Sequence, residues 1–501
     1  MMSPYNTGLT LFASGSSSTG SFISKRPESY GAKRDGRDVY DAAMTNGSAV
    51  LTSATAAFTA SDVGKAINVV GAGSAGGTLS TTILFRQSTT QVTLSAASSA
   101  TISSKQALWG TDDTAAIKSA LNAAVAACQA DGSCYCEVQF SAGVYVLAGA
   151  TTKGGATLGN AQIPLPAIEP GNGQKVTIVL RGLTDSGAFM HWLQTRGQKS
   201  GVVLRTMLVG QTPDGTWGSP SVIGTNTANL ASGSVFSNIR VVFAGITISS
   251  PLDPNFIMAD MRGAAQMDPS MLAVLVDGTP AQLSTPTSSG GVGLYAPSIN
   301  NNDSVNISYY TCEGVYYALA CSDHLVFTSM RLIYYNTAIY INATSGTYTH
   351  GMSGLYLSAE AGSTIIEKSN STNNRYPIFI GRLDTETQTG TAIKDPSDNL
   401  HGFIGWASND GADPTTTGCK HVKIENANRD RGALTPTLPA TTVASTPIFR
   451  DMALTVTGGT VTAIAVDGTA TGLTSGTVIV PCGKSFAITY SSSPTLRAQL
   501  L

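Results

Sequence analysis

The sequence predicts an all-β fold built mainly from a solenoid of stacked parallel strands, and two observations carry that prediction. Charged residues make up only 12% of the 501 residues, while glycine, serine, threonine and alanine are abundant, as expected for short strands joined by tight turns. Residues 305–395 hold four similar lines of sequence, and aligning Val315, Ala338, Thr364 and Ala392 gives spacings of 23, 26 and 28 residues. A repeat of this length predicts coils that bury their inward side chains against neighbouring coils.

Further strand-like runs extend the predicted coils in both directions. Earlier turns are expected at 175–183, 202–210 and 235–249, and a last one at 420–428. The segments 150–174, 211–234 and 277–292 are rich in glycine, proline, serine and threonine and are expected to be loops. Because loop excursions from a solenoid gather on one face, that face is the first place to look for binding.

The stretch at 109–132 predicts a helix. Thr111 can act as its N-cap, and Asp112 and Asp113 place negative charge beside the unpaired amides of the first turn. Apolar residues then follow at helical spacing from Ala116 to Val125. The paired aspartates are therefore interpreted as the start of a helix and not as catalytic carboxylates.

Three segments carry a resemblance to a known family. "SYGAKRDG" (29–36), "GTDDTAAIKSALNAA" (110–124) and "VQFSAGVYVL" (138–147), in this order, resemble the N-terminal signature of pectin-lyase-like right-handed parallel β-helix proteins. The resemblance implies that a strand and a short helix cap the open end of the coil. It also implies that the first full turn begins at the strand ending in Gly143 to Tyr145.

The long insert between Gly36 and Gly110 reads as a small strand-rich module. Inserts of this kind resemble those of bacteriophage tail proteins. The expected organisation is an N-terminal attachment segment at 1–28, a β-helix cap at 29–149 with the β-rich insert at 37–109, and the parallel β-helix at 150–430.

A separate C-terminal unit is expected after a proline-containing linker at 431–447. Residues 448–501 alternate in hydrophobicity around glycine turns and predict a small β-sandwich-like domain. Its segment "VTGGTVTAIAVDGTATGLTSGT" is similar to the terminal module of minor tail proteins in phages of actinobacteria. By analogy with β-helix tail proteins, this resemblance implies a homotrimer that assembles with other phage tail or baseplate proteins.

Composition disfavours several partners. The net charge is −2 without a lysine or arginine cluster, so no nucleic-acid partner is expected. No apolar stretch is long enough to insert into a membrane, and the first residues lack the features of a signal peptide. The seven cysteines are scattered and the histidines show no ligand spacing, so no metal and no cofactor are expected. These features suit a virion protein made in the host cytoplasm.

Candidate catalytic carboxylates come from spacing alone, because the catalytic strings of polygalacturonase-like and pectate-lyase-like members are missing. Glu360 precedes Asp384 and Glu386 by 24 and 26 residues, about one turn, so their carboxylates are expected to meet, with Arg382 near enough to bias their ionisation. Weaker candidates are Glu313, Glu367, Asp303, Asp260, Asp268 and Asp277. The alternative is that all of these are solvated turn residues.

Tyrosines supply the second candidate site. Tyr309 and Tyr310 lie 25 residues before Tyr334 and Tyr335, so the two pairs are expected to stack on adjacent turns. One ring of each pair should face outward, where it suits stacking against sugars, and Trp406 could extend the ladder. A purely structural ladder is the alternative.

Three functions remain open. The leading hypothesis is a phage tailspike or minor tail protein that recognises host cell-surface polysaccharide, with depolymerase activity undecided. The alternative is a polysaccharide-degrading enzyme, hydrolase or lyase, that uses carboxylates of the β-helix groove. The third is a structural tail component without a ligand.

Overall fold

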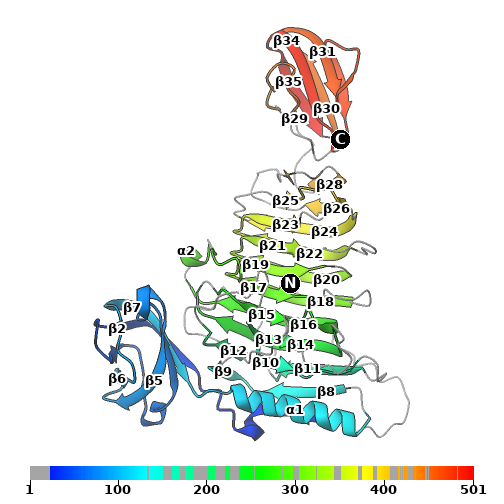
Figure 1. Ribbon diagram of the computed structural model, residues 1–501. Helices are drawn as coiled ribbons and strands as arrows, with labels where there is room; N and C mark the ends of the chain where they lie inside the picture. Colours follow the sequence, from blue (N-terminus) through cyan, green and yellow to red (C-terminus); the bar gives the residue numbers. More distant parts are fainter. Residues whose placement is uncertain are drawn as a thin grey trace, which may run out of the picture.

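Large parallel β-sheets dominate the chain, as the sequence predicts (Figure 1). The computed structural model describes residues 23–132, 135–149, 161–169, 175–183, 201–208, 220–225, 236–252, 254–278, 280–284, 286–296, 304–322, 324–342, 351–369, 375–386, 392–406, 416–417, 419, 421–426, 433–434, 436–445, 448, 451–481 and 483–500. The expected attachment segment at 1–28 lies mostly outside these residues.

The first parallel sheet contains the longer strands. In spatial order they are β1 (Ile23–Lys25), β8 (Tyr135–Phe140), β11 (Val176–Gly182), β14 (Ser237–Ser250), β16 (Ala264–Val276), β18 (Ser304–Glu313), β20 (Leu325–Ile333), β22 (Met352–Glu360), β24 (Tyr376–Glu386), β26 (Leu400–Trp406) and β28 (His421–Asn426). Two shorter strands, β9 (Gly143–Leu147) and β12 (Val202–Thr206), pair with each other, and β12 also pairs with β14.

The second parallel sheet contains short strands. In spatial order they are β10 (Ala161–Leu165), β13 (Ser221–Thr225), β15 (Ile257–Asp260), β17 (Val292–Tyr295), β19 (Tyr317–Cys321), β21 (Thr337–Ile341), β23 (Thr364–Lys368), β25 (Ile393–Lys394) and β27 (Thr416–Thr417). Strands β10 and β13 lie inside two of the segments expected to be loops, so that expectation is wrong at these positions. Five-residue strands inside polar stretches carry too weak a hydrophobic pattern to be found.

From β14 onward the chain alternates between the two sheets, and every coil lies on the previous one. The first half of β14 pairs with β11 and its second half with β12, so each long strand serves two faces. We call the outward side of the first halves of the long strands face 1. The outward side of their second halves, together with that of β9 and β12, is face 2. The outward side of the second sheet is face 3.

Inward side chains fill the space between the sheets in aligned layers. Leu272, Tyr310 and Met330 occupy one register position on successive long strands, and all three are buried. A glycine makes room where a neighbouring ring is large, since a Cβ at Gly354 would meet the Phe327 ring of the preceding coil. Each coil therefore depends on its neighbours for its core.

In successive coils, the residue at the turn from face 2 to face 3 has a left-handed backbone conformation with positive φ. Gly314, Tyr334 and Ala361 follow directly after strands β18, β20 and β22, with φ of 80°, 51° and 52°. Their preceding residues pair in register, so the three corners lie above one another. This left-handed corner turns the chain sharply without a longer loop.

Helix α1 (Thr114–Ala130) lies across the end of the stack, where its buried stripe covers the exposed edge of the first coil (Figure 1). It starts later than Thr111, which is not the N-cap: Thr111 donates its backbone N–H and its hydroxyl to Asp35 instead. Asp112 accepts the N–H of Thr114 and so satisfies one amide of the first turn. Asp113 faces away and accepts the N–H groups of Lys33 and Arg34.

Asp113 makes the stability of the cap depend on pH. Burial, opposed by its two N–H bonds and reinforced by the charges of Asp35 and Asp112, raises its pKa to about 6. A carboxyl whose pKa is higher in the folded chain stabilises the fold fully below its ordinary pKa, and this stabilisation is lost as pH rises through about 6. Relative to Asp113→Asn, wild-type protein should therefore lose roughly 2–3 kcal/mol of unfolding free energy between about pH 4 and about pH 7.

Urea unfolding of both proteins across this range measures that difference, because the other carboxyl groups cancel between them. Asp131→Asn, at the exposed far end of α1, is the matched control for the same change of carboxyl to amide outside the cap contacts. A difference from wild type that does not change with pH for Asp113→Asn, or that changes equally for both variants, would contradict the prediction.

The insert folds as a closed antiparallel barrel beside the lower coils (Figure 1). Its strands are β2 (Arg37–Met44), β3 (Val50–Thr52), β4 (Ala66–Val69), β5 (Leu79–Arg86), β6 (Gln91–Leu94) and β7 (Ile102–Gly110), with 3-10 turns η2 (Ala60–Asp62) and η3 (Ser74–Gly76). A further 3-10 turn, η1 (Pro27–Tyr30), precedes it. The barrel has its own core around Phe58 and Trp109.

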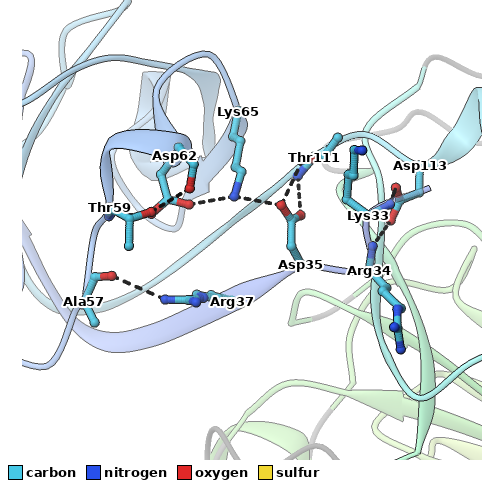
Figure 2. Close-up of polar contacts among 11 residues, drawn as sticks. Lys33, Arg34, Asp35, Arg37, Ala57, Thr59, Asp62, Lys65, Thr111 and Asp113 are labelled. Carbon is cyan, nitrogen blue, oxygen red and sulfur yellow. Dashed lines mark hydrogen bonds and ion pairs between the residues drawn. The ribbon is translucent and has the colours of Figure 1, made fainter. Parts of the chain in front are cut away.

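Both ends of the barrel meet at one polar junction, drawn in Figure 2. Asp35 accepts hydrogen bonds from Thr111 and lies 2.7 Å from Lys65 Nζ, which also contacts Asp62 at 2.7 Å. The backbones of the entry and exit segments come close together at Gly36 and Gly110, where a Cβ on Gly110 would stand 2.9 Å from the Cα of Gly36. The glycines permit the close approach, the hydrogen bonds from Thr111 to Asp35 tie the entry of the barrel to its exit, and the ion pairs of Lys65 connect Asp35 to η2.

A separate unit follows the stack (Figure 1). It contains β29 (Ala433–Leu434), β30 (Met452–Thr457), β31 (Thr460–Val466), β32 (Thr469–Ala470), β33 (Gly476–Val480), β34 (Phe486–Ser492) and β35 (Thr495–Leu500), arranged as two antiparallel sheets around one core. The expected linker at 431–447 is partly built into this unit, because β29 pairs with β35 and Thr442 and Ser445 bond to β34.

Candidate functional site

Face 2 divides into a covered part and an uncovered part. On β12 and β14 the outward residues Val203, Arg205, Thr247 and Ser249 are buried. The barrel covers them: Asn68 of β4 donates to the backbone of Met207, and Leu108 of β7 packs on Val146 and Met207. Beyond the barrel, the outward side chains of β18, β20, β22 and β24 form the candidate site; most are at least partly exposed, and Thr311, Glu313, Ile333 and Ser358 are buried.

Twelve outward positions on these four strands fall into three aligned columns, which we call the column surface. The columns are Tyr309, Ser329, Tyr356 and Arg382; then Thr311, Arg331, Ser358 and Asp384; then Glu313, Ile333, Glu360 and Glu386. Members of one strand alternate with buried residues of the core, so all twelve point to the same side. Ten of the twelve are tyrosine, serine, arginine or acidic residues, which makes the surface polar.

Ion pairs hold these side chains in place. Arg331 donates to both carboxylate oxygens of Glu360, at 3.1 and 3.2 Å, and the hydroxyl of Ser358 donates to the same carboxylate at 2.6 Å. On the next coil Arg382 donates to Asp384 at 3.1 and 2.9 Å. The Arg382 guanidinium also lies over the ring of Tyr356, 5.7 Å from its centre. Paired guanidinium groups and a stacked ring give the surface a fixed geometry.

Acidic side chains gather at the corner beside Tyr334. Burial, followed by the charges of Glu313, Glu360 and Glu386, raises the pKa of the Tyr334 phenol. Glu360 and Glu386 are register partners on adjacent strands, as their spacing predicts. The corner therefore offers one phenol and several carboxylates to a polyhydroxylated ligand.

The carboxylates are better suited to binding than to proton donation. Glycoside hydrolysis needs one carboxyl group that stays protonated and can give its proton to the leaving oxygen. Glu360 and Asp384 each accept hydrogen bonds from a guanidinium, so their oxygens already have fixed donors. A carboxylate held in this way can still accept hydrogen bonds from hydroxyl groups, whereas reaching a leaving oxygen would require it to break from its guanidinium partner.

The tyrosine pairs do not stack as expected. Tyr309 pairs with Ser329, because the coil from β18 to β20 is shorter than the tyrosine spacing, and Tyr334 and Tyr335 lie after β20. Tyr310 and Tyr335 are buried in the core, and Tyr310 donates its hydroxyl to the carbonyl of Ala318. Only Tyr309 and Tyr334 of the four reach the column surface. Trp406 ends β26, and its side chain lies outside the described part.

The weaker acidic candidates have structural partners or lie elsewhere. Glu367 is on face 3, where it accepts hydrogen bonds from Lys394 and Thr337. Three other weaker candidates form ion pairs with arginines: Asp260 with Arg262, Asp268 with Arg240 and Asp277 with Arg205. Asp303 lies outside the described residues. Asp277 and Arg205 belong to the contact between the barrel and the coils.

Sequence reasoning missed Arg331, Tyr356 and Ser358. Successive coils differ in length: Tyr317 pairs with Thr337, twenty residues on, whereas Thr337 pairs with Thr364, twenty-seven residues on. A fixed repeat therefore misaligns the columns by several residues. The signal that could have found Arg331 is the alternation of inward and outward side chains in the segment from Met330 to Tyr335, which places Arg331 on the outward side.

In the part of the chain that the structure describes, no three histidine, cysteine, aspartate or glutamate side chains are arranged to hold a metal ion. No helix among those residues is both long enough and apolar enough to cross a membrane. Neither the models of known protein families nor the curated proteins contain a match to this chain.

Proposed function

We propose that this chain is a right-handed parallel β-helix protein of a bacteriophage tail, and that its column surface binds polysaccharide of the host cell surface. The alternation of the chain between two stacked parallel sheets, and α1 at the end of the stack, support the β-helix. The resemblance of the cap segments and of the C-terminal unit supports the tail protein.

One observation carries the binding proposal: the uncovered part of face 2 presents aligned and prearranged polar groups. Tyr356 and Arg382 offer a ring and a guanidinium, while Glu360 and Asp384 offer acceptors that already have fixed positions. Adjacent strands are about 4.8 Å apart, so equivalent groups recur along the coil axis. A repeating, polyhydroxylated chain can contact several of these groups without paying much ordering entropy in the protein.

A polysaccharide-degrading enzyme is the second candidate, because Glu360 and Glu386 are register partners beside Tyr334. In that case Glu386 would serve as the general acid, since Glu360 is held by Arg331. The third candidate, a structural tail component, requires no use of the column surface at all.

One assay separates the three functions. Purified protein is incubated with surface polysaccharide extracted from candidate hosts, and both bound polymer and new reducing ends are measured. The proposal expects binding without new reducing ends. Release of reducing ends that Glu360→Gln and Glu386→Gln abolish, with binding retained, would establish the enzyme instead. Absence of both binding and cleavage with every host would leave the structural role.

The same proposal includes a homotrimer within the virion, in contact with other tail or baseplate proteins. Sedimentation equilibrium should give about three times the 51.5 kDa chain mass. A monomer at all concentrations would contradict the trimer without affecting the binding proposal.

A further inference from the structure

Face 1 of the middle coils is exposed and carries no charge. Among the residues that the structure describes, the outward ones on the first halves of β18, β20, β22 and β24 are all exposed, and none of them is charged. One column of register partners on these strands contains Asn306, Val326, Ser353 and Phe379. A second column, two residues later in the same strands, contains Ser308, Thr328, Leu355 and Gly381. We call these two columns the uncharged strip.

Large apolar side chains stand out from the uncharged strip. Leu355 is 64% exposed, Val326 is 50% exposed and Phe379 is 48% exposed. The ring of Phe379 stacks on that of Phe403, its register partner on β26, with ring centres 5.7 Å apart, so the apolar character extends one coil further. Exposed apolar side chains that are contiguous on one face of a protein mark a contact surface.

The low charge of the whole chain does not explain the uncharged strip. On the same four strands, each column of the column surface holds an arginine or an acidic residue. Charged residues return only at the two ends of the strip, as Arg240 with its partner Asp268 and as Lys423 of β28. Loss of charge from the centre of a surface, with charges kept at its rim, is typical of a contact between proteins.

The uncharged strip is long and narrow. Its two columns are about 7 Å apart, and it runs for about 19 Å along the coil axis from β18 to β26. A two-fold contact between flat faces needs more width, and on these strands further width reaches the charged columns of face 2. Around a three-fold axis, by contrast, each copy contributes one narrow edge, so the shape of the strip fits three copies better than two.

The absence of charge also suits a contact between identical chains. When the coil axis is parallel to a three-fold axis, each residue close to that axis meets the same residue of two other copies. A column with Glu360 or Arg382 in this position would bring like charges together, which opposes association. The uncharged strip brings together only apolar, hydroxyl, amide and glycine groups.

We propose that the uncharged strip is the contact through which three copies of the chain associate, with their coil axes parallel to the three-fold axis. This inference rests on the homotrimer of the proposed function and adds the surface that forms it. Equivalent coils of the three copies lie at the same height, and Val326, Leu355 and Phe379 become buried. The contact uses none of the residues of the column surface.

Sedimentation equilibrium of the full-length chain tests the contact. Leu355→Glu places three like charges beside the axis, so the measured mass should fall about threefold, from the trimer to the single chain. Leu84→Glu is the matched control, because Leu84 is a leucine of β5 in the barrel with a similar exposure of 61%. This control should keep the trimer mass.

A cross-link tests the three-fold geometry without adding charge. Oxidation with copper phenanthroline should join two Ser353→Cys chains by a disulfide, seen on a denaturing gel, because equivalent residues of the strip meet near the axis. Ser80→Cys, at an exposed position of β5 in the barrel, is the matched control and should stay unlinked. Wild-type protein treated in the same way measures any link through the native cysteines.

The wild-type mass separates a failure of the homotrimer from a failure of this inference. A wild-type monomer at all concentrations would overturn the homotrimer and the inference with it, and a wild-type dimer would overturn the three-fold contact. A wild-type trimer that Leu355→Glu leaves intact, or the absence of a link between Ser353→Cys chains, would overturn the uncharged strip as the contact while the homotrimer stands.

Discussion

Replacing Arg205 by methionine is expected to lower the free energy of unfolding by about 3–5 kcal/mol. The Arg205 side chain is fully buried between the coils and the barrel, where it forms an ion pair with Asp277 and donates to Ser249. Gln106 of β7 donates to the same Asp277 carboxylate at 2.5 Å. Removal of the guanidinium would leave a buried carboxylate without its compensating charge, which costs more than the lost contact itself.

Chemical denaturation of the variant measures this loss. Arg240→Met is the matched control, because Arg240 pairs with Asp268 on the exposed part of the same sheet and should cost less than about 1 kcal/mol. Combining Arg205→Met with Asp277→Leu should recover most of the stability, since no buried charge then remains. Equal losses for Arg205→Met and Arg240→Met would contradict a buried clamp between barrel and coils.

Replacing Tyr356 and Arg382 together by alanine is expected to weaken binding of host polysaccharide by about 100-fold. The change removes an aromatic surface and a charged donor, each contributing about 1–2 kcal/mol, and about 3 kcal/mol corresponds to that factor. Neither side chain is in the core, so the fold should stay intact. Isothermal titration with the extracted polysaccharide measures the affinity.

The matched control for this variant removes the same residue types elsewhere. Tyr30 in η1 and Arg497 in β35 are both exposed and far from the column surface in the sequence. Tyr30→Ala with Arg497→Ala should bind like wild type. Weakening of both double variants to the same extent would mean that the column surface has no special part in binding.

The general architecture could be predicted from sequence because burial in stacked coils leaves a repeated pattern. The stripe from Ala116 to Val125 identifies α1, and the repeat between 305 and 395 predicts stacked parallel strands, both of which the structure contains. The short strands β10 and β13 could not be predicted, because three or four apolar residues in a polar segment look like a loop. Right-handed winding rests on resemblance and remains part of the proposal.

The candidate site could be predicted only in part. Spacing brings Glu360 and Glu386 together correctly because that coil happens to match the assumed repeat. The same reasoning fails for the stacking of the tyrosine pairs, since the coil after β18 is shorter and Tyr309 pairs with Ser329. The expected alternation within each pair holds, because Tyr310 and Tyr335 are buried in the core. The contact between Arg331 and Glu360 depends on which residues of neighbouring coils are paired. Because the coils differ in length, a repeat of fixed length does not predict that pairing. The role of Arg205 depends on how the barrel docks, and no local pattern encodes that contact.

The position of a bound host oligosaccharide, determined by crystallography of the full chain, tests the central claim most directly. The account predicts sugar density along face 2 between β18 and β24, in contact with Tyr356 and Arg382 and with hydroxyl groups donating to Glu360. Density confined to face 3 or to the C-terminal unit, with the column surface empty at saturating ligand, would contradict it.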